Sequence, residues 1–366
     1  LLGPFYAALP ERVAFGADAT QDKSGWRFDQ LTLDDPGVLR VESKLRLGAS
    51  TAITVDAFDA TFPAAYDRYA KSLLAPHGLG ELAARGRLRG SVDWDANGLS
   101  GFVARPENLD VKDEAGRFAV DGLDGELDWR RSGSRPATTL SWRSAELYRL
   151  SLGPTKFDWR AEAGTLQLVA PASVPLFGGA LELPHFAWRP DAAAGARVDT
   201  ALAVYGVELA GVTRAFGWPE FGGTLGGAVP QIRYAGDRIE LGGGLALAVF
   251  GGSIDVTNVT LERPFGVAPS LAATITFADL DLQALTGTFD FGEITGRLSG
   301  RMGALRLVDW SPVAFDAELH ALDGGRISQR AVNSLSSVGG GGLVAGLQAS
   351  LLRIFDTFGY SRLGLS

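Results

Sequence analysis

The chain has 366 residues, of which 46% are hydrophobic and 21% are charged, so it can bury a core and is not a disordered chain. Its net charge of −8 argues against nucleic acid as a partner, because phosphate binding requires an excess of basic side chains. The absence of cysteine excludes disulfide scaffolds, cysteine-based zinc and iron–sulfur sites and a thiol nucleophile, and three histidines leave few general bases.

Apolar and polar residues alternate along most of the chain. Between Leu39 and Leu47 apolar side chains recur at every second position, interrupted by one serine, and charged residues fill the positions between them. Successive side chains of a strand point to opposite faces, so this pattern predicts a strand with one dry and one wet face. The same pattern recurs in residues 87–94, 126–130, 157–160, 239–249, 271–277, 294–301 and 313–320.

One apolar and one charged face are typical of an antiparallel sheet that is wetted on one side. We expect roughly 16–20 such strands, which is too many for one flat open sheet, so the sheet should curl. No segment resembles a linker, and the sequence gives no clear domain boundary.

Helical signals are few. Residues 63–85 predict a helical insert, and residues 326–358 predict a C-terminal helical pair that four consecutive glycines interrupt. The second helix of that pair, Leu343–Phe358, has an apolar stripe that fits either a cap on the sheet end or a helix on a membrane surface. The uncharged run 331–352 contains polar residues and glycines, so no window predicts a transmembrane helix.

Residues 207–227 and 280–300 are two copies of one repeat, with an offset of 73 residues. A third, partial copy of its Gly-x-Leu-x-Gly strand begins at Gly86. Repeats that extend a sheet in one direction build an elongated structure. The matched pairs include Val207/Leu280, Leu209/Leu282, Phe216/Phe289, Gly223/Gly296, Leu225/Leu298 and Gly227/Gly300.

We predict no enzyme activity, because the common catalytic motifs are missing, and we predict no catalytic residue, metal or cofactor. Asp93–Gly98 begins like a calcium-binding loop, but its twelfth position is an alanine, and a hairpin turn explains the segment. Asp316, Glu318 and His320 share one strand face and could form a metal or acid–base cluster, or simply a solvated face. Gly242–Gly244 could bind phosphate, or mark a bend or bulge in a strand.

The apolar sheet face allows two interpretations. It could pack on a second sheet as the core of a sandwich or barrel, or it could stay partly open and line a trough for an apolar ligand. The alternation by itself leaves both open. For the trough, the expected lining residues are Leu241, Leu245, Leu247, Val249, Ile254, Val256, Ile275, Phe277, Leu298, Phe315 and Leu319.

Three C-terminal segments, 289–300, 305–317 and 325–338, resemble the C-terminal region of YdbH-type proteins, which belong to the AsmA-like group that includes TamB. The final stretch, 351–365, is similar as well. The resemblance is strong over residues 200–366 and weaker over residues 1–200. It implies a mainly β fold over residues 1–366, a long curled antiparallel sheet that forms a U-shaped hydrophobic β-groove with a few short helices. It implies no catalytic residue.

The resemblance also implies a function, which is intermembrane phospholipid transport across the periplasm of a Gram-negative bacterium, with the lipid tails carried in the groove. The implied partners are phospholipids and a small outer-membrane lipoprotein (YnbE-like) that adds a strand at the C-terminal end. The family has an inner-membrane helix that is missing from this chain, so we interpret the chain, which starts at Leu1, as a fragment of a longer protein. The alternative function is a non-catalytic β-scaffold for outer-membrane biogenesis. A carbohydrate-active enzyme would require converging carboxylates, which are not evident.

Overall fold

The fold is mainly β, with antiparallel pairing and a few short helices, as the sequence predicts. The structure is a computed structural model that describes residues 13–365, apart from positions 24, 49, 194, 265, 267 and 322 and the stretch 339–356. Twenty-five strands belong to one hydrogen-bonded sheet system, and β25 and β26 form a second sheet. The chain divides into two compact units. Unit 1 comprises Leu1–Leu176, Glu182–Ala201 and Phe265–Val267, and unit 2 comprises Phe177–Leu181, Leu202–Pro264 and Ala268–Ser366.

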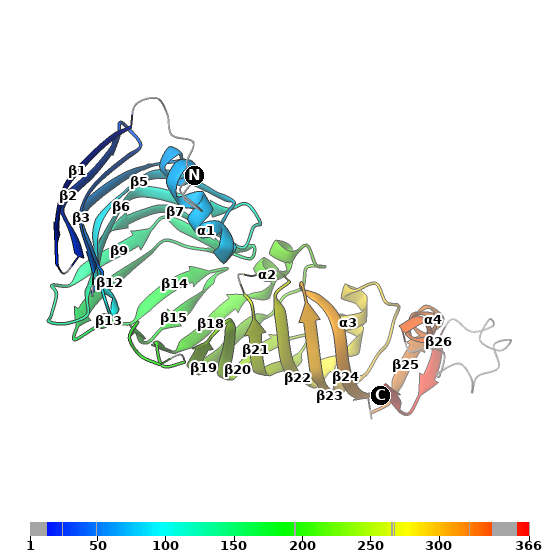
Figure 1. The fold of residues 1–366 in the computed structure, drawn as a ribbon. Helices are drawn as coiled ribbons and strands as arrows, with labels where there is room; N and C mark the ends of the chain where they lie inside the picture. The colour runs from blue at the N-terminus through cyan, green and yellow to red at the C-terminus, as the bar shows by residue number, and fades with distance from the viewer. Residues whose placement is uncertain are drawn as a thin grey trace. The chain divides into compact units, whose positions relative to one another are not determined.

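Unit 1 begins with six long strands, each paired antiparallel with the next in chain order (Figure 1). They are β1 (Ala14–Asp22), β2 (Gly25–Asp35), β3 (Leu39–Gly48), β4 (Ala52–Phe62), β5 (Leu82–Asp95) and β6 (Gly98–Asp113). Between β4 and β5 the chain is helical, with a π-helical turn over Tyr66–Ala70, α1 over Lys71–Leu74 and a 3-10 turn over Ala75–His77. The expected helical insert 63–85 is therefore shorter than the pattern suggests, because its last four residues pair with β6 as part of β5.

The carboxylate of Asp35, at the end of β2, fastens this helical segment to the sheet. It accepts hydrogen bonds from the Arg68 guanidinium (2.6 Å) and from the Tyr69 hydroxyl (2.9 Å). Burial and the hydrogen bond to Asp35 together raise the pKa of Tyr69 to about 12. The hydroxyl of Tyr66 in turn donates to the Leu79 carbonyl and accepts from the Leu82 amide, which fixes the entry into β5.

Beyond β6 the sheet of unit 1 forks into two series of short strands. β6 pairs with β7 through Leu109–Lys112 and with β8 through Gly101–Ala104. One series continues from β7 through β10 and β11 to β14, and the other from β9 through β12, β13 and β16 to β17. These strands are β7 (Phe118–Gly125), β8 (Leu127–Arg130), β9 (Thr138–Trp142), β10 (Ser144–Leu147), β11 (Leu150–Leu152), β12 (Thr155–Glu162), β13 (Thr165–Leu168), β14 (Ala172–Leu176), β16 (Phe186–Trp188) and β17 (Val198–Thr200); β15 (Gly179–Leu183) crosses the boundary between the units.

At this fork unit 1 has a packed aromatic core. The side chain of Trp129 is completely buried, and its Nε1–H donates to the Gly164 carbonyl at 3.0 Å. Its ring packs against the rings of Phe102 and Trp188, at centroid distances of 6.1 and 5.6 Å. Buried Leu166 and Ala161 complete the cluster, so this part of the apolar face is sealed by protein.

Unit 2 is an antiparallel meander in which short helices separate two pairs of strands (Figure 1). Its elements are β18 (Leu202–Glu208), α2 (Leu209–Phe216), β19 (Thr224–Ala235), β20 (Arg238–Val249), β21 (Gly252–Glu262), β22 (Ser270–Asp281), α3 (Leu282–Thr288), β23 (Arg297–Val308) and β24 (Ser311–Ala321). They are followed by β25 (Gly325–Ser328), α4 (Gln329–Val338), β26 (Thr357–Tyr360) and β27 (Leu363–Leu365).

The ends of the expected C-terminal helical segment 326–358 are strands. Residues 326–328 belong to β25 and residues 357–358 to β26, because these two short strands pair with each other. Between them α4 is helical over Gln329–Val338, whereas most of the second expected helix, 343–358, lies outside the described residues.

The two sequence repeats have the same local structure. In each copy a strand leads into a helix whose first backbone amide bonds to a glycine carbonyl, from Leu209 to Gly223 and from Leu282 to Gly296, both at 3.0 Å. Both glycines have a positive φ, 131° and 123°. The donor and the acceptor of the second bond each lie 73 residues after those of the first. The strand–helix–strand unit is therefore the element that repeats along the sheet of unit 2.

The N-cap distinguishes the two copies. The Asp281 carboxylate caps α3 by accepting from the amides of Gln283 (2.8 Å) and Ala284 (3.0 Å), whereas Glu208, at the same place before α2, makes no side-chain cap. We expect Asp281→Ala to lower the free energy of opening of α3 by about 1 kcal/mol. Amide hydrogen exchange measures this, with Glu208→Ala as the matched control, which should leave the exchange of α2 unchanged. Equal effects of both changes would contradict this role for Asp281.

Bulges interrupt the alternation on many of the long strands of both units. An extra residue lies between Phe28 and Leu31 on β2 and between Thr257 and Thr260 on β21, and similar shifts occur on β4, β19 and β23. A bulge bends its strand and increases the local twist. At Gly243, opposite the bulge on β19, a Cβ atom would lie 2.4 Å from the Ala228 carbonyl oxygen, so the glycines 242–244 allow close strand approach inside a sheet.

Candidate functional site

Apolar side chains form continuous rows across the strands of unit 2. Residues directly opposite each other in an antiparallel pair lie on the same face, so the strand registers define the rows. The first row runs through Val207, Leu225, Leu247, Ile254, Phe277, Gly300 and Leu319. The second row runs through Val204, Gly227, Leu245, Val256, Ile275, Met302 and Ala317. We call the surface formed by these two rows the apolar face of unit 2.

The expected lining residues fall into three groups. Leu245, Leu247, Ile254, Val256, Ile275, Phe277 and Leu319 lie in the two rows. Leu241 lies opposite Ile232 beyond the bulge, and Phe315, on β24, is 58% exposed. Val249 is buried with Leu209 of α2, and Leu298 lies opposite Leu280 at the start of β23.

Apart from Val204 and Val207 on β18, which are buried, the side chains of these rows are half-buried rather than sealed. Leu247, Ile254 and Phe277 are all of intermediate exposure, although large apolar side chains in the core of a sandwich are usually fully buried. Val249, by contrast, is only 4% exposed beneath α2. This exposure favours the interpretation in which the face stays partly open to an apolar ligand.

Unit 1 has the same kind of apolar face, although the set of expected lining residues contains none of its side chains. Its rows run through Phe28, Leu45, Ile53, Trp94 and Leu99, and through Leu31, Ser43, Val55, Val92, Phe102 and Trp129. Trp26, Ile53 and Trp94 are 45%, 41% and 50% exposed. The alternation between Leu39 and Leu47 was the signal that could have placed lining residues here as well.

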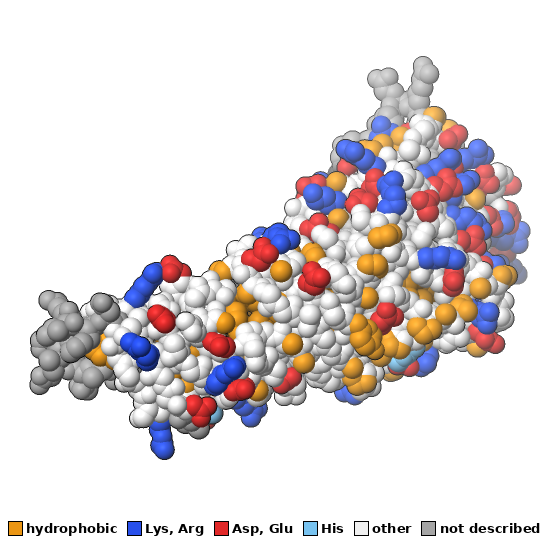
Figure 2. Space-filling model, turned by 180° about the vertical axis from the view of Figure 1, so that it is seen from behind, with side chains coloured by type: hydrophobic (Ala, Val, Ile, Leu, Met, Phe, Trp, Pro, Cys, Tyr) orange, Lys and Arg blue, Asp and Glu red, His pale blue; other side chains and the backbone are white. Residues whose placement is uncertain are grey.

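Charged residues of both signs cover the other side of the long strands of unit 1. Ion pairs join neighbouring strands, for example Lys44 to Asp56 at 2.9 Å, Arg105 to Glu126 at 2.6 Å and Arg87 to Asp59. Figure 2 shows such basic and acidic side chains interspersed over the surface of unit 1. Exposed pairs contribute little stability individually, but together they keep this side hydrated, so the sheet is strongly amphipathic.

The structure places the motifs that resembled catalytic or metal sites on strands and a turn of the sheet. Asp93–Gly98 is the turn between β5 and β6. There the carboxylate of Asp95 accepts from the Asn97 amide, and the Arg131 guanidinium holds its pKa below the ordinary value of 3.8. Asp316, Glu318 and His320 lie on β24, and within the described ranges no three His, Asp or Glu side chains are grouped to hold a metal ion.

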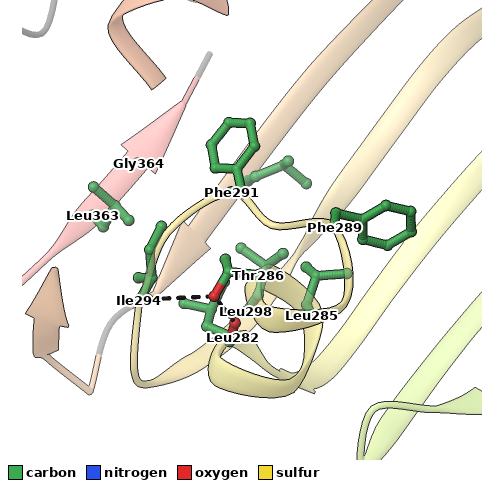
Figure 3. Close-up of a pocket in the computed structure, with 10 residues that line it drawn as sticks. Leu282, Leu285, Thr286, Phe289, Phe291, Ile294, Leu298, Leu363 and Gly364 are labelled. Atoms are coloured by element: carbon green, nitrogen blue, oxygen red, sulfur yellow. Dashed lines mark hydrogen bonds between the residues drawn. The ribbon is translucent and has the colours of Figure 1, made fainter. Parts of the chain in front are cut away.

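A pocket opens beneath α3 in unit 2, with a volume of about 310 Å³. Its lining is apolar apart from Thr286 and comes from one helix, the loop after it and three strands. Figure 3 shows most of these side chains. The residues are Leu282, Leu285 and Thr286 of α3, Phe289, Phe291 and Ile294 of the following loop, Leu298 of β23, Leu319 of β24, and Leu363 and Gly364 of β27. Leu298 and Leu319 were expected lining residues. The others were not, although positions 282, 285 and 289 are apolar at helical spacing within the repeat.

An antiparallel sheet with a half-exposed apolar face and a charged opposite face is typical of proteins that hold apolar ligands or partners. The family model described as YdbH-like, intermembrane phospholipid transport protein YdbH, matches residues 8–224, which is more than half of the chain. The chain therefore belongs to the YdbH-like family of intermembrane phospholipid transport proteins. No curated protein matches the chain, and no solved structure matches it.

The match covers mainly the part of the chain for which the sequence resemblance is weaker. It includes nearly all of unit 1 and the first repeat copy up to Thr224, and it ends before β20. The family is one of lipid transport and not a known class of enzyme, and its cargo is phospholipid. None of the helices in the described ranges combines the length and hydropathy that a membrane span requires.

Proposed function

We propose that the apolar faces of the two units carry the acyl tails of phospholipids, while the headgroups remain in water, in a β-groove that crosses the periplasm between the inner and outer membranes of a Gram-negative bacterium. The observation that carries the proposal is the pair of half-buried apolar rows across β19–β24. The expected lining residues of unit 2 and the rows around Ile53 and Trp94 in unit 1 would contact the tails. Membership of the YdbH-like family supports phospholipid as the cargo.

The energetics favour such a surface over diffusion through water. Each methylene group removed from water contributes about 0.8 kcal/mol, so one tail of about 15 methylenes would lose about 12 kcal/mol if it crossed water unprotected. A row that continues from strand to strand lets a tail exchange one set of apolar contacts for the next. No side chain has to react in such a step, so the proposed function is not enzymatic.

The edge of β24 supports a proposal about the partner. β27 pairs with β24 only through Leu319, His320 and Ala321, and no pairing on that edge is described for Ser311–Glu318. An edge strand with open amides and carbonyls can accept a further strand. We propose that a small outer-membrane lipoprotein adds its strand there.

One observation favours the alternative function, a non-catalytic scaffold. Around Trp129 the apolar rows of unit 1 end in a core that protein fills completely. A scaffold would have such packing along its whole length. The half-exposed rows of β2–β5 and of unit 2 favour transport over this alternative.

The test is whether the purified chain carries lipid. We expect organic extraction and mass spectrometry of the chain, expressed in a Gram-negative host, to yield phospholipid in at least equimolar amount. The stripped chain should also take up a fluorescent phosphatidylethanolamine from vesicles of phosphatidylethanolamine and phosphatidylglycerol. A folded chain that neither retains phospholipid nor acquires it from vesicles would exclude the transport proposal.

A further inference from the structure

We propose that the pocket beneath α3 binds the methyl end of a single acyl chain, as a subsite distinct from the open apolar rows. This inference rests on the proposed function. The pocket is formed by the second repeat copy together with β27, the strand that lies beside β24. It would hold the end of a tail as the lipid reaches the last strands of unit 2.

The chemistry of the lining excludes a polar ligand. Among the described residues of the wall, Thr286 has the only polar side chain, and its hydroxyl is already used inside the protein. It donates to the Leu282 carbonyl at 2.7 Å and accepts from the Ile294 amide at 3.3 Å, as the dashed lines in Figure 3 show. A headgroup or a sugar would lose its hydrogen bonds to water on entry and gain none, which costs several kcal/mol. Hydrocarbon has no such cost.

The size of the pocket suits a chain end and not a whole lipid. Its volume of about 310 Å³ is about twice that of an engineered apolar cavity of ~150 Å³ that stays dry and binds benzene or xenon. A complete phospholipid with two tails is much larger than this space. One tail can therefore enter with its end while the rest of the lipid stays on the apolar face.

The leucine that begins the helix is buried in both repeat copies, with Leu282 4% exposed beside Ile294 and Ala321 in the second, but its surroundings differ. In the first copy Leu209, which corresponds to Leu282, is 3% exposed and packs in a cluster with Val249 and Leu280, to which Phe250 also belongs. In the second copy the corresponding space is bordered by Leu363 and Gly364 of β27 and is hollow. The pocket of the second copy therefore depends on β27, a strand outside the repeat, for part of its wall.

The pocket is continuous with the apolar face. Leu319 belongs both to the first apolar row and to the pocket wall. Phe289, which is 46% exposed, also lines the pocket, and its ring lies 6.0 Å from that of Phe221, which in turn lies 5.0 Å from that of Phe250. A tail that leaves the rows can therefore enter the pocket without crossing polar surface.

Photocrosslinking of the complete chain tests the inference. The probe is phosphatidylethanolamine with a diazirine either near the methyl end of one tail or close to the glycerol. We expect the methyl-end probe to label residues 282–294, and the glycerol-end probe to label mainly other positions. Leu285→Trp, whose larger indole takes up part of the pocket, should reduce methyl-end labelling of residues 282–294 roughly tenfold without reducing labelling of β20–β22.

Val212→Trp is the matched control, because Val212 occupies the position of Leu285 in the first repeat copy. It should leave the labelling of residues 282–294 unchanged. If Leu285→Trp does not fold, the smaller change Leu285→Phe should give a partial reduction. Labelling of β20–β22 without labelling of residues 282–294, or labelling that Leu285→Trp does not reduce, would overturn the pocket while leaving the transport proposal standing. Absence of labelling throughout the chain would overturn both.

Discussion

Phe277→Glu should abolish most phospholipid capture by the chain. Phe277 lies at the centre of the first apolar row, opposite Ile254 on one side and Gly300 on the other. A carboxylate there keeps its water and prevents tails from covering the neighbouring side chains. If about four methylene groups lose their apolar contacts, the loss is about 3 kcal/mol, or roughly a hundredfold in affinity. The measurement is uptake of fluorescent phosphatidylethanolamine from vesicles, together with the phospholipid that co-purifies.

Thr276→Glu provides the matched control. Thr276 precedes Phe277 on β22 and therefore points to the opposite face, where it lies opposite Asp255 and Arg301. The Thr276→Glu variant carries the same added charge on the same strand, and we expect it to capture lipid as the wild type does. Leu247→Asp, in the same row on β20, should reproduce the loss. Undiminished capture by folded Phe277→Glu and Leu247→Asp variants would show that tails do not use this face.

The long strands could be predicted from the sequence because each follows a clean period of two. The alternation between Leu39 and Leu47 corresponds to β3, which runs over Leu39–Gly48, and the alternation after Ile239 corresponds to β20. The short strands of unit 1 could not be predicted in the same way. Strands of three to five residues, such as β11 and β14, are too short to show a period, and their pairing is set by contacts distant in sequence. The expected strand number was therefore below the 27 strands in the part of the chain that the structure describes.

Bulges explain why the alternation did not yield the whole apolar face. Val256 and Leu261 are five residues apart, so strict alternation places them on opposite faces of β21. The extra residue between Thr257 and Thr260, where Asn258 has a φ of 53°, returns Leu261 to the face of Val256. The sequence signal for such a bulge is a spacing of three between apolar residues inside an alternating run. This signal can be interpreted only if bulges are considered in advance.

The pocket beneath α3 was beyond sequence reasoning for a different reason. Leu298 and Leu319 could be assigned to the apolar face from alternation alone. Leu363, however, comes from a three-residue strand at the end of the chain, and nothing local in the sequence indicates that it pairs with Ala321. The repeat identified residues 280–300 as a structural unit, whereas the pocket depends on which strand borders that unit.

Trp129→Ala should cause the largest loss of stability in unit 1 without reducing lipid capture by unit 2. Trp129 is fully buried and its indole donates to the Gly164 carbonyl. Truncation leaves a large cavity and an unpaired carbonyl, which costs about 3–5 kcal/mol. A chain of two compact units need not unfold in one step, so the measurement is amide hydrogen exchange in β8 and β12.

Trp26→Ala is the matched variant that distinguishes a tryptophan that packs in the core from one that is available to a ligand. Trp26 is the same residue type in the same unit, but it is 45% exposed and lies opposite Leu47 on the apolar side of β2 and β3. Its removal should lower the free energy of opening by about 1 kcal/mol or less, because little packing is lost, and it should reduce methyl-end photocrosslinking to β2–β5. A sealed scaffold requires the two tryptophans to behave alike, with comparable destabilisation and no effect on lipid. An open face requires them to differ in both measurements, because one ring is covered by protein and the other is left for a tail.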